Sequence, residues 1–248
     1  MITNQQTGTR VDEIVNGIYR ISTPLDILPG GFSINQYLIV DDEPLLFHTG
    51  WRRMFATAAE AISKVIPVDR LRHVGLSHFE GDECGAMNEF LDAAPSAVPF
   101  SSAIGAMISV NDFAKRPAHG LEDGEEFSTG HHRLQWIYTP HVPHGWDCGV
   151  IFDKTTGTLF CGDLFTQGGA NCPPVTEGDI LGPSELFRKP LDYFAHASAM
   201  EGILEKLADL KPTLLACQHG SAFRGDGGAL LLQLSRTLAK ERLVAAQP

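Results

Sequence analysis

The sequence lacks an apolar run long enough to cross a membrane. The longest runs, such as residues 229–232, fall far short of the ~20 residues that a bilayer requires. The first eight residues also lack the basic region and the apolar stretch that together mark a signal peptide. We therefore expect neither a membrane partner nor a secretory leader.

Basic residues are scarce. Lys and Arg total 19 against 30 Asp and Glu, which gives a formal net charge of −11 over 248 residues. This balance argues against nucleic acid or an anionic membrane surface as a partner. We find no break in composition, no repeat and no low-complexity tract, so residues 1–248 are expected to form a single domain with an ample hydrophobic core.

Paired cysteine motifs are missing as well. The five cysteines are odd in number and scattered, with no CxxC pair. Such usage is typical of a reducing compartment, and we expect a cytoplasmic protein whose cysteines serve mainly as small buried hydrophobic residues.

The pattern of short β-branched runs and amphipathic segments predicts strands and helices in two similar halves. The first half has strands at 17–21, 35–40, 45–47 and 73–77, with helices at 54–65 and 85–91. The second half has strands at 134–138, 148–152, 158–161 and 213–217, with helices at 200–210 and 228–243. Periodicity alone supports an α/β or α+β fold. The division of the elements into two similar halves suggests an α+β fold, a four-layer αββα sandwich. The Gly- and Pro-rich stretch 167–183 is expected to form a loop over the site.

One imidazole and three carboxylates follow the predicted strand 73–77 within six residues. They are His78, Glu80, Asp82 and Glu83. A chain leaving the end of a buried strand can aim several side chains at one point. Oxygen ligands beside a histidine suit a redox-active divalent metal, so this stretch predicts half of a metal site.

The other half is expected from residues that follow later strands. The candidates are His144, Asp163 and His219. His141 competes with His144 for the same position. We expect the histidines elsewhere to have surface or packing roles; they are His73, His119, His131, His132 and His196.

Taken together, residues 17–245 resemble the metallo-β-lactamase superfamily. The resemblance is carried by the motif at His78, the segment 47–50, the Thr-Pro loop with His144, the Cys-Gly-Asp segment at Asp163, and the terminal His219-Gly220. It implies the four-layer αββα sandwich of the metallo-β-lactamase type.

The motif reads H-x-E-x-D, where hydrolases of the superfamily have H-x-H-x-D-H. Glutamate in the second slot resembles the flavodiiron proteins and related oxygen-binding diiron proteins. The resemblance implies that His78, Glu80 and His144 bind one metal, that Asp82 and His219 bind the other, and that Asp163 bridges the two. The family's spacing to Asp163, together with the following Gly145, favours His144 over His141. It also implies a homodimer, although the sequence itself shows no interface.

Two residues depart from the family pattern. Glu83 stands where most of the superfamily has histidine, and it is either a further carboxylate ligand or a side chain that points away and leaves a metal position open. His48 replaces the usual aspartate near the ligands, and we expect it to hold them in place rather than merely end a strand. Trp51, Trp146 and Phe165 are expected either to line the pocket or to belong to the core.

The carboxylates favour iron. Two Fe(II) ions bring a formal charge of +4, against −3 from Glu80, Asp82 and Asp163, or −4 if Glu83 also binds. Glutamate in place of a neutral histidine stabilises Fe(III) and suits nitrogen-rich tetrahedral zinc less well, although zinc remains an alternative metal.

The predicted function is to bind or reduce dioxygen, with nitric oxide as a neighbouring substrate, at two iron ions. Two Fe(II) ions supply two electrons, whereas reducing dioxygen to water takes four. No flavin motif and no fused FMN domain are found in the sequence, so we expect either an oxygen sensor with a signalling partner or an oxidoreductase with a separate electron-donor protein. The alternatives are a dinuclear zinc hydrolase acting on an ester, thioester or phosphodiester and a metal-free interaction module, which is disfavoured because unmetallated buried carboxylates are costly.

Overall fold

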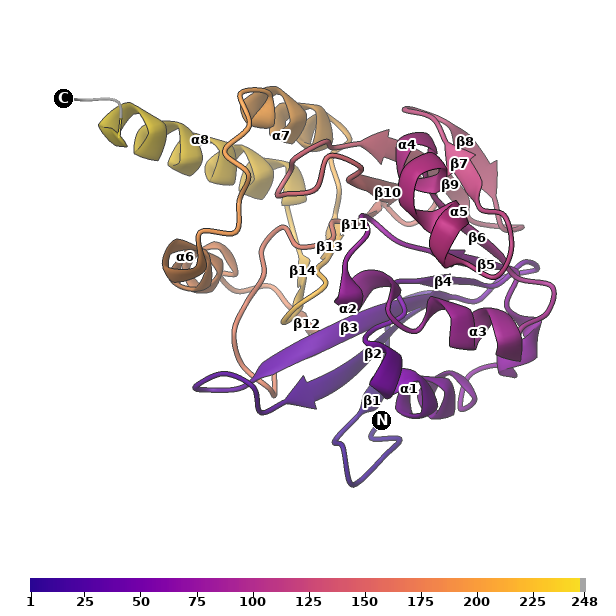
Figure 1. Cartoon of the computed structure of the whole chain (residues 1–248). Coiled ribbons are helices and arrows are strands. Elements are labelled where there is room, and N and C mark those ends of the chain that lie inside the picture. Colours follow the sequence, from indigo (N-terminus) through magenta and orange to yellow (C-terminus); the bar gives the residue numbers. More distant parts are fainter. Residues whose placement is uncertain (246–248) are drawn as a thin grey trace.

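Two seven-stranded sheets form the centre of the molecule. The computed structural model describes residues 1–245, and Figure 1 shows the chain passing from the first sheet to the second as it runs from the N-terminus to the C-terminus. No helix among the described residues combines the length and the apolar character needed to cross a membrane.

The first sheet is built in sequence order, from β1 to β7. Its strands are β1 (Arg10–Val15), β2 (Ile18–Leu25), β3 (Phe32–Ile39), β4 (Leu45–Phe47), β5 (His73–Gly75), β6 (Val98–Ser102) and β7 (His119–Leu121). β1 to β4 pair antiparallel, whereas β4 to β7 pair parallel. The parallel strands need crossover connections, and these supply the helices on the outer face.

The second sheet has the order β12, β14, β13, β11, β10, β9, β8. Its strands are β8 (Glu126–Ser128), β9 (Arg133–Tyr138), β10 (Gly149–Asp153), β11 (Thr158–Phe160), β12 (Val175–Thr176), β13 (Leu214–Ala216) and β14 (Ala222–Arg224). β11 pairs parallel with β13, so the two strands end at the same edge of the sheet. This edge and the end of β5 position the site.

The helices lie outside the two sheets. On the first half they are α1 (Phe55–Ile62), α2 (Gly81–Cys84), α3 (Met87–Ala93), α4 (Ala103–Gly105) and α5 (Asn111–Phe113), with a π-helical turn at Ala106–Val110 and 3₁₀ turns at Arg52–Met54 and Val68–Arg70. On the second half they are α6 (Leu181–Leu191), α7 (Met200–Asp209) and α8 (Gly227–Ala245).

Three apolar clusters separate the layers. One packs α1 and α3 against the first sheet, for example Ile62 and Phe90 against Val74. A second joins the two sheets, with Phe47 facing Phe160. The third packs α7 and α8 against the second sheet. The layer order is therefore helix, sheet, sheet, helix, which confirms the predicted αββα sandwich.

Several elements differ from the sequence-based expectation. The strand predicted at 73–77 ends at Gly75, the helix predicted at 85–91 corresponds to α3, and the preceding single turn α2 was not predicted. Strands β1, β6, β7, β8, β12 and β14 and the helical segment 103–113 were not predicted. The second half of the expected loop 167–183 contains β12 and the start of α6. The one-turn α2 matters most, because it carries Asp82 and Glu83.

Candidate metal centre

The motif residues leave the end of β5 and enter α2. His78 is buried in the turn, Glu80 precedes the first residue of α2, and Asp82 and Glu83 lie within that single turn of helix. His144 lies between β9 and β10, Asp163 follows β11, and His219 follows β13. All seven predicted ligands therefore come from segments that follow or connect strands of the two sheets.

A first group of side chains converges around Glu80. Its Oε2 atom lies 2.9 Å from Nε2 of His78 and 2.9 Å from Nε2 of His144. Asp163 Oδ2 lies 3.5 Å from Nε2 of His78 and 3.3 Å from Nε2 of His144. One potential ligand atom from each of these four residues lies within 4.8 Å of the others. The rival His141 is exposed and is not in the group.

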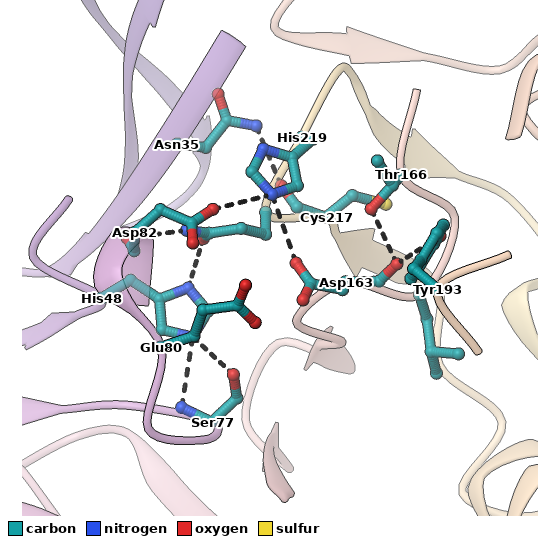
Figure 2. Close-up of polar contacts among 12 residues, drawn as sticks. Asn35, His48, Ser77, Glu80, Asp82, Asp163, Thr166, Tyr193, Cys217 and His219 are labelled. Atoms are coloured by element: carbon teal, nitrogen blue, oxygen red, sulfur yellow. Dashed lines mark hydrogen bonds and ion pairs between the residues drawn. The ribbon is translucent and has the colours of Figure 1, made fainter. Parts of the chain in front are cut away.

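A second group consists of Asp82, Glu83 and His219, and their ligand atoms also lie within 4.8 Å of one another. His219 Nε2 lies 3.2 Å from Asp82 Oδ2 and 3.2 Å from Asp163 Oδ1. Figure 2 shows the ring of His219 between these two carboxylates, with Glu80 facing the same space. Asp163 thus presents one oxygen to each group, the arrangement expected of a bridging ligand.

The ring nitrogens that face the carboxylates are free to bind a metal. His219 Nδ1 donates to the carbonyl of Ser33 (2.8 Å), so in the neutral ring the lone pair is on Nε2. His78 Nδ1 lies 3.0 Å from the Ser77 hydroxyl, and its Nε2 faces Glu80. These Nε2 atoms meet carboxylate oxygens, and only a cation can hold such atoms together. A metal ion at each group therefore fits the residues present.

The pKa shifts of His219 and Glu80 also indicate that the carboxylates of both groups need positive charge beside them. Burial lowers the pKa of His219, but hydrogen bonds to Asp163 and Asp82 outweigh it and raise this pKa to about 10. Hydrogen bonds from His144 and His78 lower the pKa of Glu80 to about 2. Without a metal, protons would have to supply the missing charge.

Glu83 is the least satisfied residue of the centre. Its side chain is fully buried, and neither carboxylate oxygen has a hydrogen-bond partner among the described residues. Burial, and then the negative charge of Asp163, raise its pKa well above the usual value. Its backbone carbonyl is held by the N–H of Thr49 at 2.7 Å. Of the two expected positions, the structure has the side chain pointing into the second group.

His48 contacts the residues that directly precede a ligand of the first group and a ligand of the second group. Its Nε2 accepts the backbone N–H of Ser77 (3.2 Å), so its Nδ1 carries the proton and donates to Gln218 Oε1. Gln218 Nε2 in turn donates to the carbonyl of Asp82 at 3.1 Å. Burial lowers the pKa of His48 to about 4, so the ring is neutral at pH 7. Ser77 and Gln218 directly precede His78 and His219, and that adjacency was the only sequence signal for them.

The loop that carries His219 is held by β3 of the other sheet. The side-chain amide of Asn35 donates to the carbonyls of Cys217 and Gly220, both at 2.9 Å, and the Tyr37 hydroxyl donates to the Cys217 carbonyl at 2.6 Å. Figure 2 shows Asn35 beside this loop. These contacts fix the position of His219 relative to the motif on the first half.

The loop of His144 is tied to the motif by Asp147 and Gly145. Asp147 Oδ2 accepts the N–H of Phe79 at 2.9 Å. Gly145 has a φ of +79°, and a Cβ atom there would lie 3.2 Å from the Cβ of His78. A side chain at position 145 would therefore strain the backbone and crowd a ligand.

A cavity of about 230 Å³ opens onto the centre. Its apolar wall contains Leu28, Phe32, Phe187 and Leu191, and the ring of Phe32 stacks on His219 with centroids 4.4 Å apart. The hydroxyl of Tyr193, another wall residue, donates to the Asp163 carbonyl at 3.1 Å. This wall was not predicted, because nothing in the sequence relates β3 and α6 to the ligands.

The expected loop does not line the cavity, and of the three named aromatics Phe165 belongs to the core, one of its two expected alternatives. The wall includes no residue of the stretch 167–183, and α6 takes the place of the expected loop. Trp51 lines a separate outer groove, Trp146 is exposed, and Phe165 is buried in the core, so none of the three named aromatics lines the cavity.

The remaining histidines lie beside carboxylates rather than ligands of the two groups. The pairs are His73–Glu43, His119–Glu125, His131–Asp41, His132–Asp153 and His196–Asp192. A surface or packing role agrees with these contacts.

The αββα sandwich, with His and carboxylate ligands gathered where strands end, places the chain in the metallo-β-lactamase fold class. The family described as ODP family beta lactamase matches residues 32–220, which is more than half of the chain. The protein therefore belongs to this family.

Curated relatives are longer flavoproteins and oxidoreductases. The chain is 26% identical over 206 residues to rubredoxin-oxygen oxidoreductase of Megalodesulfovibrio gigas, covering 79% of this chain and 50% of that protein. It is 28% identical over 201 residues to type A flavoprotein fprA of Rhodobacter capsulatus, covering 77% and 44%. The chain thus spans half or less of the length of these relatives.

Solved structures share the fold. Rubredoxin oxygen:oxidoreductase from Desulfovibrio gigas superposes with a TM-score of 0.77 at 20% identity, over 92% of this chain and 62% of that chain. The flavodiiron protein from Giardia intestinalis superposes with a TM-score of 0.80 at 19% identity, over 94% and 60%. At this level of identity the likeness concerns the fold alone.

Proposed function

We propose that the protein holds two iron ions and binds or reduces dioxygen, with nitric oxide as a neighbouring substrate. The observation that carries the proposal is the bridging position of Asp163, whose two oxygens face two separate groups of ligand atoms. His78, Glu80 and His144 would hold one ion, and Asp82, Glu83 and His219 the other.

The donor set supports iron over zinc. Seven side chains supply three imidazoles and four carboxylates, and buried Glu83 adds a charge that a zinc hydrolase does not need. Hard anionic ligands favour a higher oxidation state and higher coordination numbers than tetrahedral zinc. The zinc hydrolase alternative loses support for the same reason.

Two iron ions would supply the electrons and the binding position for a diatomic molecule. The chain's own residues do the rest. Phe32, Phe187 and Leu191 keep the cavity above His219 largely apolar and small, which suits dioxygen better than a bulky ester. The contacts of His48 and Asn35 hold the ligands in place.

Steady reduction of dioxygen needs an electron donor, and we propose a separate donor protein. The name of the Megalodesulfovibrio relative pairs that protein with a rubredoxin, which supports a donor of this kind. If the protein is a sensor, we propose a signalling partner in place of the electron donor.

We also propose a cytoplasmic location, because all five cysteines are free. A homodimer is implied by the family resemblance, and light scattering would test it.

The test is to load metal-free protein with Fe(II) without oxygen and then to add oxygen. We expect two Fe(II) per chain, oxygen consumption faster than by free Fe(II), and a new visible absorption band. A chain that takes up two zinc ions instead and rapidly cleaves an ester or thioester would contradict the proposal. The Glu205→Gln variant is a suitable control, because Glu205 is exposed on α7.

A further inference from the structure

Two cysteines lie side by side beneath the metal centre. The Sγ atoms of Cys161 and Cys217 are 3.8 Å apart, and both residues are 0% exposed. Both are free thiols in the structure. No other cysteine pair among the described residues has a recorded sulfur–sulfur contact.

The pair has a fixed relation to the proposed ligands. β11 and β13 are parallel neighbours in which Phe160 is opposite Ala216, so the next residues along both strands are Cys161 and Cys217. Two residues further on are Asp163 and His219. Each cysteine is therefore connected to a ligand through a single intervening residue, and Figure 2 shows Cys217 on the segment that leads to His219.

The strand geometry allows a disulfide. Neighbouring strands lie about 4.8 Å apart, which falls within the Cα separation of roughly 4.4–6.8 Å found for disulfides. Bond formation would bring the sulfurs from 3.8 Å to about 2.05 Å. The N–H of Cys161 already donates to the Ala216 carbonyl at 3.1 Å, so the two strands need not separate or rearrange.

We propose that Cys161 and Cys217 form a redox-active dithiol that supplies two electrons to oxygen reduction at the neighbouring metal centre. The inference rests on the proposed function. Reduction of dioxygen to two waters takes four electrons and four protons. Two electrons come from the two Fe(II) ions and two from the thiols. The two S–H bonds break and release two protons, one S–S bond forms, and solvent supplies the other two protons.

Burial suits this role. Both sulfurs lie in the apolar cluster between the second sheet and its helices, away from oxidants and small thiols in solution. The dithiol would thus store two electrons. With them, one dioxygen molecule could be reduced fully to water instead of only to hydrogen peroxide. Packing alone would leave the thiols unchanged when the iron is oxidised.

The experiment counts thiols after one exposure to oxygen. Full-length protein loaded with two Fe(II) per chain is mixed with oxygen, denatured, alkylated with a maleimide and weighed by intact mass spectrometry. We expect the free thiols to fall from five to three, with peptide mapping locating a Cys161–Cys217 disulfide. Metal-free protein given the same oxygen should keep all five.

Variants separate the dithiol from the iron chemistry. Cys161→Ser should retain all four remaining thiols and release at least twofold more hydrogen peroxide than the unaltered protein. Cys172→Ser is the control, because Cys172 lies in the 167–183 stretch outside the pair, and it should still lose two thiols. Treating folded metal-free protein with diamide, a dithiol oxidant in solution, tests the shielding without iron and should leave Cys161 and Cys217 reduced, because both residues are 0% exposed.

The outcomes that overturn the inference are distinct. Iron that oxidises while all five thiols survive, or a disulfide that involves Cys84 or Cys148, would overturn the dithiol alone. Iron that remains Fe(II) under oxygen would overturn the proposed function, and this inference with it.

Discussion

At the residue scale, we propose that Glu80 determines which metal is bound. Its Oε2 atom lies 2.9 Å from both His78 Nε2 and His144 Nε2, so it sets the charge of the nitrogen-rich group. We predict that Glu80→His shifts binding toward zinc, because it removes one negative charge and adds a nitrogen ligand. The measurement is competition between Fe(II) and Zn(II) without oxygen, in which the preference should change about tenfold or more, equivalent to roughly 1.4 kcal/mol.

The matched control is Glu205→His, which makes the same substitution at an exposed position and should leave the competition unchanged. An equal Fe-to-Zn ratio for Glu80→His and the unaltered protein would count against the charge argument.

Replacing Glu83 should change the stability of the metal-free protein and the binding of the second metal in opposite directions. Its unpartnered buried carboxylate destabilises the metal-free protein, so Glu83→Met should raise the free energy of unfolding without metal by about 1–3 kcal/mol. The same variant should lose a ligand and bind the second metal more weakly. Urea denaturation with and without Fe(II) measures both effects.

A purely structural Glu83 would give a different result. The substitution would then lower stability in the metal-free and metal-loaded protein alike. Glu205→Met, at an exposed position, should change stability by no more than about 0.5 kcal/mol.

At the element scale, the turn between β10 and β11 depends on Asp153. This buried carboxylate accepts hydrogen bonds from His132 Nδ1 (2.8 Å), Thr156 Oγ1 (2.6 Å) and the N–H of Thr155 (3.0 Å). Burial raises its pKa, but these bonds outweigh burial and hold the pKa below the usual value. We predict that Asp153→Asn costs about 1–3 kcal/mol of stability at pH 7.

The pH dependence follows from the sign of the shift. Because the folded pKa is lowered, the stabilisation is fully present above the unfolded value of about 3.9 and is lost as the pH falls through the folded value. Urea midpoints of Asp153→Asn and the unaltered protein should therefore begin to converge as the pH falls below about 4. A difference that stays constant down to pH 3 would show that the charge of Asp153 is not responsible. Asp209→Asn, an exposed change, is the control.

The sequence predicted elements where periodicity and turn residues agree. Helix α1, strand β4 and the helices α7 and α8 lie close to their expected positions. Helix α6 was missed because its glycine and prolines resemble a loop. Pro183 falls in the first turn, where its missing N–H is harmless, and Asp179 Oδ1 accepts the N–H groups of Leu181 and Gly182.

The candidate ligands could be predicted for a physical reason. Each follows or connects strands, and a polar residue such as Asp163, three residues after the end of buried strand β11, has few roles other than a site. The orientation of Glu83 could not be predicted, because it depends on the single turn α2 and on the contact of Thr49 with the Glu83 carbonyl. The cavity wall requires knowing which helix covers which sheet edge, and that is tertiary information.

At the scale of the whole molecule, each ligand group draws on both halves of the sandwich. His78 and Glu80 come from the first half and His144 and Asp163 from the second, and the second group likewise joins Asp82 and Glu83 to His219. Metal binding at the proposed centre would therefore be coupled to the packing of the two sheets, because an ion bound only in the folded state stabilises that state.

The central claim is that the centre holds two iron ions for oxygen chemistry, and metal analysis of protein purified without added metal tests it most directly. Elemental analysis by mass spectrometry should give about two iron atoms per chain and little zinc, as expected from the four carboxylates among the seven ligand residues. Two zinc atoms per chain from iron-replete cells, with rapid hydrolysis of an ester or thioester, would contradict the account.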